Sequence, residues 1–350
     1  MNDKKNYISN ILLIMGSILL TLLIIEIGLN FFWENPFKNT RASEVVELRL
    51  LSPSVDKTLN RSWLDKKDPF VKYRTNKDRF ILPVNQHKDP QYTVMFLGGS
   101  TTQCSYVKES LRFPALVSKI LNEYGLKVNT INSGRAGNTL HDSINIFFNY
   151  INKFKPNYVI LMHATNDRGV LSRDPNYSSR MGQEVTYKKM IKWVGQSLSC
   201  HIQIIAFLRH TVTNIFLKKY EYTGLDSFKD EKPGKTDFGP FYKRLNVFVN
   251  MSRNMGSTPI LMTQPLASVR SKISPDWLNM PDQQKLNEMI RLVAKEQNVP
   301  LIDLSLHMKT IPDYETHLTD YLYDGMHVSD KGSKEYAKYI CERLGKIFMQ

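Results

Sequence analysis

The chain has 350 residues, of which 42% are hydrophobic and 23% charged, and this length suits one sizeable α/β domain with an appendage better than one small domain. Its formal net charge of +14 is spread along the sequence. Nucleic acid, an anionic membrane, an acidic polymer and a solvated basic surface all fit such a charge. An odd number of cysteines without CxxC spacing favours neither a disulfide framework nor a zinc knuckle, so we expect buried thiols. The cysteines are Cys104, Cys200 and Cys341.

The first predicted element is an apolar helix from Ile8 to Trp33, whose one charged residue is Glu26. A helix of this length crosses a hydrocarbon core of about 30 Å. No small-x-small cleavage pattern follows, so we expect residues 8–33 to be an uncleaved signal anchor after a short tail, residues 1–7. Basic residues flank both ends, but a short tail before a large domain favours the N-terminus inside and the domain outside the cytoplasm. Glu26 is costly in lipid, and either the interface or another membrane protein would satisfy it.

Residues 34–90 contain five prolines among charged residues and show no sustained period, which predicts a linker and lead-in segment. A domain over residues 91–350 follows, in which short apolar strands alternate with helical patterns. The expected strands are 93–97, 128–131, 158–162, 260–262 and 299–302, and the expected helices are 113–124, 140–154, 283–297 and a last helix through 336–347. This alternation predicts a three-layer α/β/α domain with a central parallel sheet, similar to flavodoxin in architecture.

The stretch of about residues 170–250 is long for a connection between strands, which predicts an insertion with its own structure, such as a lid. Within it, an apolar and basic segment that includes Trp193, Phe207 and Lys218 has the composition of a helix at a surface. Two interpretations remain open. The segment lies on an anionic membrane, or it packs on the domain with a basic outer face.

Four polar or small-residue signals follow the predicted strands or precede the last helix. Ligands bind outside the carboxyl ends of the strands in a parallel sheet. Ser100 follows the first strand and opens the first helix, where free backbone N–H groups favour developing negative charge. Gly137 can bring its N–H close to a substrate, and Asn166 can donate its side-chain amide to an oxyanion. Asp324 and His327 add an acid three residues before a histidine, so the set provides the raw material of a nucleophilic triad.

In this order the signals resemble the SGNH, or GDSL, hydrolase family over roughly residues 90–350. The last block, Asp-x-x-His, is matched in full. The first block has Gly99 where the family has an acid, and the third block has Ala164 where the family has glycine. Gly137 matches the second-block glycine better than Gly134 does. The blocks in this chain are Gly98-Gly99-Ser100, the segment from Asn132 to Thr139, Ala164-Thr165-Asn166-Asp167 and Asp324-Gly325-Met326-His327.

The resemblance implies an SGNH-hydrolase fold and a Ser-His-Asp mechanism. Ser100 would be the nucleophile, His327 the general base, and Asp324 the residue that orients the imidazole. Gly137 and Asn166 would form the oxyanion hole with the Ser100 N–H. The other histidines lack metal-ligand spacing, so neither a metal nor a cofactor is expected.

The sequence therefore predicts a membrane-anchored serine esterase that hydrolyses a short acyl ester, acetyl in the first place, on a cell-envelope carbohydrate. Three alternatives stay open. The triad could transfer the acyl group to a polysaccharide, as an O-acyltransferase beside a membrane acyltransferase partner. It could act on lipid, as a lysophospholipase-like esterase, or the domain could be a non-catalytic module that binds a polymer. No specific nucleic acid partner is expected, since only the net charge would favour one.

Overall fold

The computed structural model describes residues 2–35, 48–84, 87–174, 176–177, 194–195, 197–217, 236–266 and 281–349. The chain forms two compact units. The smaller unit comprises Met1–Glu47 and Glu184–Gly224, and the larger unit comprises Leu48–Gln183 and Leu225–Gln350.

The larger unit is built on a five-stranded sheet with the strand order β4-β3-β5-β6-β7. All neighbouring strands are parallel, as the alternation of strands and helices predicts. The strands are β3 (Tyr92–Gly98), β4 (Val128–Asn132), β5 (Tyr158–Met162), β6 (Thr258–Met262) and β7 (Leu301–Ile302). The predicted fold class is thereby confirmed.

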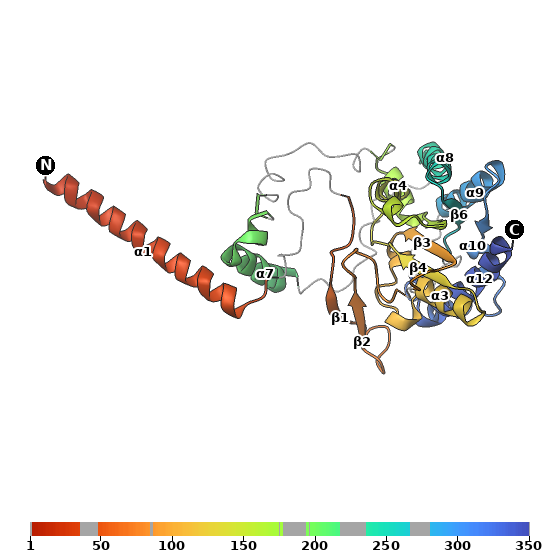
Figure 1. Cartoon of the computed structure of the whole chain (residues 1–350), viewed down its shortest axis with the longest axis horizontal. Helices are drawn as coiled ribbons and strands as arrows, with labels where there is room; N and C mark the ends of the chain where they lie inside the picture. Colours follow the sequence, from red (N-terminus) through yellow and green to blue (C-terminus); the bar gives the residue numbers. More distant parts are fainter. Residues whose placement is uncertain are drawn as a thin grey trace. The chain divides into compact units, whose positions relative to one another are not determined.

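Helices cover both faces of this sheet (Figure 1). Successive strand residues point to opposite faces, so Val94 and Phe96 enter one buried cluster while Met95 and Leu97 enter the other. The first cluster includes residues of α3 (Phe113–Glu123), α10 (Leu304–Lys309) and α12 (Asp330–Phe348). The second includes residues of α4 (Leu140–Asn149), α8 (Gly239–Asn254) and α9 (Pro281–Glu296). The sheet is therefore buried on both faces.

Short helical elements complete the larger unit. They are α2 (Ser100–Gln103), η1 (Glu109–Leu111), η2 (Ile151–Phe154), α5 (Thr165–Leu171) and α11 (Leu318–Tyr321). The predicted helix 140–154 is divided here, because α4 ends at Asn149 and η2 continues as a 3₁₀ turn.

The lead-in segment has more regular structure than its sequence indicates. An antiparallel hairpin of β1 (Asp56–Asn60) and β2 (Phe70–Arg74) precedes the sheet. Val71 and Tyr73 of β2 are buried and alternate with exposed residues, whereas β1 has no buried residue. One short strand of alternating pattern is too weak a signal to be separated from a loop by sequence alone.

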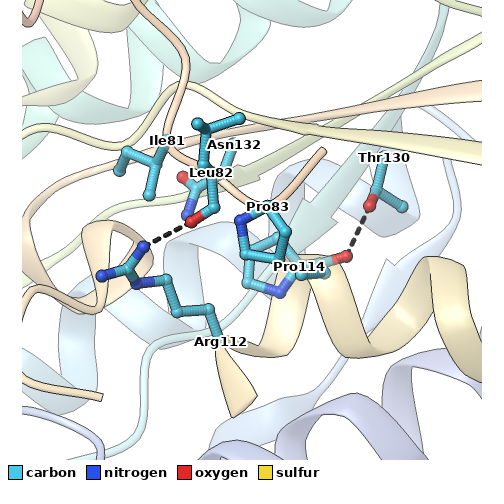
Figure 2. Close-up of a pocket in the computed structure, with 8 residues that line it drawn as sticks. Ile81, Leu82, Pro83, Arg112, Pro114, Thr130 and Asn132 are labelled. Carbon is cyan, nitrogen blue, oxygen red and sulfur yellow. Dashed lines mark hydrogen bonds between the residues drawn. The ribbon is translucent and has the colours of Figure 1, made fainter. Parts of the chain in front are cut away.

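Arg112 holds this lead-in segment against the rest of the larger unit. Its buried guanidinium donates to the carbonyl oxygens of Lys72 (2.7 Å), Cys104 (3.3 Å) and Leu82, so backbone groups satisfy the buried charge. Figure 2 shows Arg112 pointing at the Leu82 carbonyl, beside Pro83. Burial lowers the pKa of Arg112 from its ordinary value.

The smaller unit contains α1 (Asn2–Phe32) and α7 (Gln203–Leu217). Among the described residues, one helix is long and apolar enough to cross a membrane, over Asn10–Phe32 with a mean hydropathy of 2.5. The segment expected as an insertion, about residues 170–250, contributes α7 to this unit, whereas α8 packs on α4 and α9 in the larger unit.

Candidate active site

The strand order places the candidate site at a reversal of the sheet. The chain passes from β3 to β4 on one side and then returns to β5 on the other side of β3. Such a switch point leaves a crevice outside the carboxyl ends of the two strands. Gly98 and Met162 are register partners at these ends. Ser100 and Asn166, which follow β3 and β5, are consequently carried on adjacent turns.

Ser100, His327 and Asp324 form a continuous hydrogen-bonded chain in the structure. His327 Nε2 lies 2.7 Å from Ser100 Oγ, and His327 Nδ1 lies 2.6 Å from Asp324 Oδ2. Both acid and histidine are buried, while Ser100 is partly exposed. The arrangement can accept the serine proton on the ring nitrogen next to it and hold the opposite nitrogen against a carboxylate.

The Asp-x-x-His spacing lets the carboxylate of Asp324 accept hydrogen bonds from backbone N–H groups of its own loop and also contact the imidazole of His327. Asp324 Oδ1 accepts the backbone N–H groups of Met326 (3.0 Å) and His327 (2.7 Å), which leaves Oδ2 for the imidazole. Burial raises the pKa of Asp324, but the His327 ring and these N–H donors outweigh it, so the pKa lies below its ordinary value. Asp324 is therefore ionised at neutral pH and opposite the imidazole.

Two glycines permit the close packing of the serine turn. A Cβ at Gly98 would lie 2.0 Å from Thr102 Oγ1, and one at Gly99 would lie 2.6 Å from the amide nitrogen of Asn166. Real Cβ atoms do not approach so closely. Gly99, which departs from the family pattern, thus allows the Asn166 amide to approach the turn that carries Ser100.

The predicted oxyanion residues lie on two segments that a hydrogen bond joins, Gly137 on the loop after β4 and Asn166 in the first turn of α5. Asn166 donates one amide N–H to the carbonyl oxygen of Asn138 (2.9 Å), and the amide carries a second N–H. Gly137 adopts a left-handed conformation with φ 75°. Arg49 donates to Asn138 Oδ1 (3.1 Å) and to the carbonyl of Ala136 (3.3 Å), so a lead-in residue holds both sides of Gly137. The role of Arg49 has no sequence signal, because it lies far from the motif along the chain.

A second serine and histidine pair lies beneath the site, where sequence reasoning did not expect one. Ser143 Oγ is 2.7 Å from His163 Nε2, and His163 Nδ1 is 3.6 Å from Asp167 Oδ2. The other oxygen of Asp167 accepts the backbone N–H of Leu140 (2.9 Å) and the hydroxyl of Tyr177 (2.7 Å). This second array joins the turn after β5 to the start of α4. Burial lowers the pKa of His163 to about 3, so its ring is neutral.

Two aromatic side chains lie beside His327, one from its own loop and one from the lead-in segment. The ring of Tyr323 stacks on His327 with a centroid distance of 5.7 Å and an interplanar angle of 15°. Trp63, from the lead-in segment, meets Tyr323 edge-on at 5.2 Å and is 49% exposed. The hairpin region therefore contributes an aromatic surface beside the candidate site, and its sequence gave no indication of this.

The three cysteines are buried thiols, as expected. Burial raises the pKa of both Cys104 and Cys341 to about 12. Among the residues that the structure describes, no group of three or more His, Cys, Asp or Glu side chains could hold a metal ion.

A parallel sheet with a serine, a histidine and an acid at its carboxyl edge is the architecture of a nucleophilic hydrolase. The profile of the GDSL-like lipase/acylhydrolase family matches residues 96–334, which is more than half of the chain. The chain belongs to this family, and it is an ester-bond hydrolase.

Similar solved structures are related only distantly to this chain in sequence. The acetylxylan esterase Axe2 from Geobacillus stearothermophilus is 16% identical, with 73% of this chain and 95% of that chain covered and a TM-score of 0.45. A protein described as lipolytic and of the G-D-S-L family, from Desulfitobacterium hafniense DCB-2, is 15% identical, with coverage of 72% and 99% and a TM-score of 0.44. No curated protein matches the sequence.

Proposed function

We propose that this protein is a membrane-anchored serine esterase that removes a short acyl group, acetyl in the first place, from a cell-envelope carbohydrate. The observation that carries the mechanism is the continuous chain of hydrogen bonds from Ser100 through His327 to the ionised Asp324. Membership of the family supports ester hydrolysis in general. The acyl group, the carbohydrate substrate and the membrane anchor are what the proposal adds.

In the proposed mechanism, Ser100 Oγ attacks the ester carbonyl while its proton passes to Nε2 of His327. Asp324 stabilises the imidazolium that forms. Collapse of the tetrahedral intermediate expels the alcohol, which takes the proton from His327, and leaves an acyl group on Ser100. Water then attacks this acyl-enzyme with His327 as the base, and the acid is released with Ser100 restored.

Asn166 and Gly137 are the proposed stabilisers of the oxyanion, together with the Ser100 N–H. The hydrogen bonds that hold Asn138, next to Gly137, and Asn166 in place support this role, because preorganised donors need not reorient when charge develops. Each such donor contributes about 3 kcal/mol to transition-state stabilisation in comparable sites.

Two features support a carbohydrate at the membrane surface. The aromatic surface of Trp63 and Tyr323 beside His327 offers flat apolar faces on which a sugar ring can pack. The apolar helix Asn10–Phe32 supports an anchor. The short tail before a large domain favours the larger unit outside the cytoplasm.

Activity on defined esters tests the proposal. Full-length protein in detergent would be assayed for turnover of p-nitrophenyl acetate and p-nitrophenyl octanoate, and for acetate release from an acetylated polysaccharide. We expect acetate to be preferred over octanoate.

Trp63→Ala should raise the KM for the polysaccharide and leave the turnover of p-nitrophenyl acetate unchanged, with Trp63→Phe as the conservative control. Preferred cleavage of lysophospholipid would contradict the carbohydrate substrate, and acyl transfer to a sugar that outpaces hydrolysis would contradict hydrolysis as the reaction.

A further inference from the structure

Glu26, the one charged residue of the apolar span, caps a second helix. Its two carboxylate oxygens accept the backbone N–H groups of Gln203 (2.7 Å) and Ile204 (2.8 Å), the first residues of α7. These N–H groups have no partner inside the helix, and a negative charge at this end is also favoured by the helix dipole. The sequence left open whether the interface or another membrane protein satisfies Glu26. In the structure it is a helix of the same chain.

Further contacts fasten α7 and the residues before it along the end of α1. Gln203 donates its side-chain amide to Asn30 Oδ1 (3.2 Å), and Asn35 donates to the carbonyl of Ser199 (2.9 Å). The indole of Trp33 meets the ring of Phe207 edge-on at 5.5 Å. A second edge-on contact joins Trp33 to His210 at 5.7 Å. The first two turns of α7 are thus held beside the last turns of α1 and the residues that follow it.

The position of Glu26 sets the depth at which α7 begins. Glu26 lies six residues before the end of the apolar span at Phe32, which corresponds to about 9 Å along a helix axis. A backbone N–H at that depth in an apolar layer must find an acceptor within the protein. The carboxylate supplies this acceptor, which gives a physical reason for a costly charge at this place in the span.

Part of the surface of α7 is apolar and exposed. Ala206 is buried, whereas Phe207, Leu208 and Val212 are exposed, Leu208 by 56%. Phe32 at the end of α1 is 90% exposed. An exposed apolar helix face that continues from an apolar span is typical of a segment that meets lipid.

We propose that α7 lies in the interface of the bilayer on the side where α1 ends, clamped to the span by Glu26, with its Leu208 face against the acyl chains. The occupant of this face is lipid, as the continuity with α1 indicates. Arg209 on α7 and the Lys218-Lys219 pair in the sequence after it suit anionic headgroups. The inference rests on the proposed membrane anchor, and the test keeps the two apart.

Spin labels on the full-length protein in nanodiscs of phosphatidylcholine and phosphatidylglycerol test this placement. Labels would be attached at Leu208→Cys, at Leu20→Cys in the middle of α1, and at Tyr124→Cys on the exposed surface of the larger unit. The native thiols are buried, so the parent chain serves as the labelling blank. Accessibility to oxygen and to the water-soluble Ni-EDDA complex would then be measured. We expect the Leu20 and Leu208 positions to favour oxygen and the Tyr124 position to favour Ni-EDDA.

The outcomes separate the anchor from the inference. A Leu20 label that favours Ni-EDDA would overturn the anchor itself. A Leu20 label in lipid with a Leu208 label in water, or shielded from both reagents by protein, would overturn only the placement of α7. A shielded label would indicate packing on the larger unit or on a second copy.

Substitution of Glu26 tests whether its carboxylate holds α7 in place. Glu26→Ala removes both acceptors, so the Leu208 label should become several-fold more accessible to Ni-EDDA while the Leu20 label stays in lipid. Glu26→Gln keeps one acceptor oxygen and should give a smaller change. An unchanged Leu208 label in Glu26→Ala would refute Glu26 as the clamp.

Discussion

The larger unit contains the same three residue types twice, in two different settings. In both arrays a histidine Nε2 lies 2.7 Å from a serine Oγ. His327 has a carboxylate at 2.6 Å and a partly exposed serine, whereas His163 has a carboxylate at 3.6 Å and a fully buried serine. The hydrogen bond between serine and histidine is therefore not what distinguishes a reactive site from a structural one.

Burial and charge account for the difference between the two arrays. In the Ser100 array the acid has a pKa below its ordinary value and faces the imidazole at short range. In the Ser143 array burial lowers the pKa of the histidine to about 3, so the ring is too weakly basic to hold a proton near neutral pH. We interpret the second array as a support that fixes the turn carrying Asn166.

The largest expected effect separates the two histidines by activity. His327→Ala should lower kcat for p-nitrophenyl acetate by roughly 10⁴-fold or more, because the general base is lost. His163→Gln should retain turnover in its folded fraction, as measured on the same preparation. A loss of activity of similar size in both variants would contradict a catalytic role for His327 alone.

A smaller effect is expected at Asn166, the proposed oxyanion donor. Asn166→Ala should reduce kcat by about 10²- to 10³-fold with little change in KM, since the amide acts mainly on the transition state. Steady-state kinetics on the acetate ester measure both constants. A rise in KM at constant kcat would instead assign Asn166 to substrate binding.

Removal of the second serine should affect stability in place of activity. Ser143→Ala leaves His163 Nε2 without its partner in the interior, which should lower the free energy of unfolding by roughly 1–3 kcal/mol. Urea unfolding of the detergent-solubilised chain measures this, and kcat should change by less than about twofold. Abolished turnover in a folded Ser143→Ala protein would argue for a direct catalytic role.

The smallest effect concerns pH. The unfolded chain takes up a proton on His163 below its ordinary pKa of 6.5, whereas the folded chain does so only near pH 3. The contribution of His163 to stability is complete above pH 6.5 and is lost as the pH falls toward 3, by at most about 1.4 kcal/mol per pH unit. The free energy of unfolding should fall less steeply between pH 7 and 5 in His163→Gln than in the parent. Equal slopes would contradict this account.

The fold and the Ser100 array could be predicted from sequence because their signals are local. Apolar runs followed by Ser100 and Asn166 identify strand ends, and Asp324 stands three residues before its own partner. Parallel strand order then brings these turns together. The residue spacing within each block is enough to predict the array, and no contact between distant residues is needed.

The remaining features depend on contacts between residues far apart in the chain. Glu26 caps a helix that begins at Gln203, and Trp63 of the lead-in hairpin reaches Tyr323. Ser143 and His163 belong to different elements, and their environment is set by burial that no local pattern records. Sequence therefore predicted residues that the structure brings together at the strand ends, and it missed those that position and surround them.

The most direct measurement is covalent labelling with a fluorophosphonate, followed by peptide mapping. The probe reacts only with an activated serine that it can reach, so it tests burial and activation together. We expect one labelled peptide, containing Ser100, in the parent and in Ser143→Ala, and no label in Ser100→Ala. Label on Ser143, or label that persists in Ser100→Ala, would contradict the assignment of Ser100 as the nucleophile.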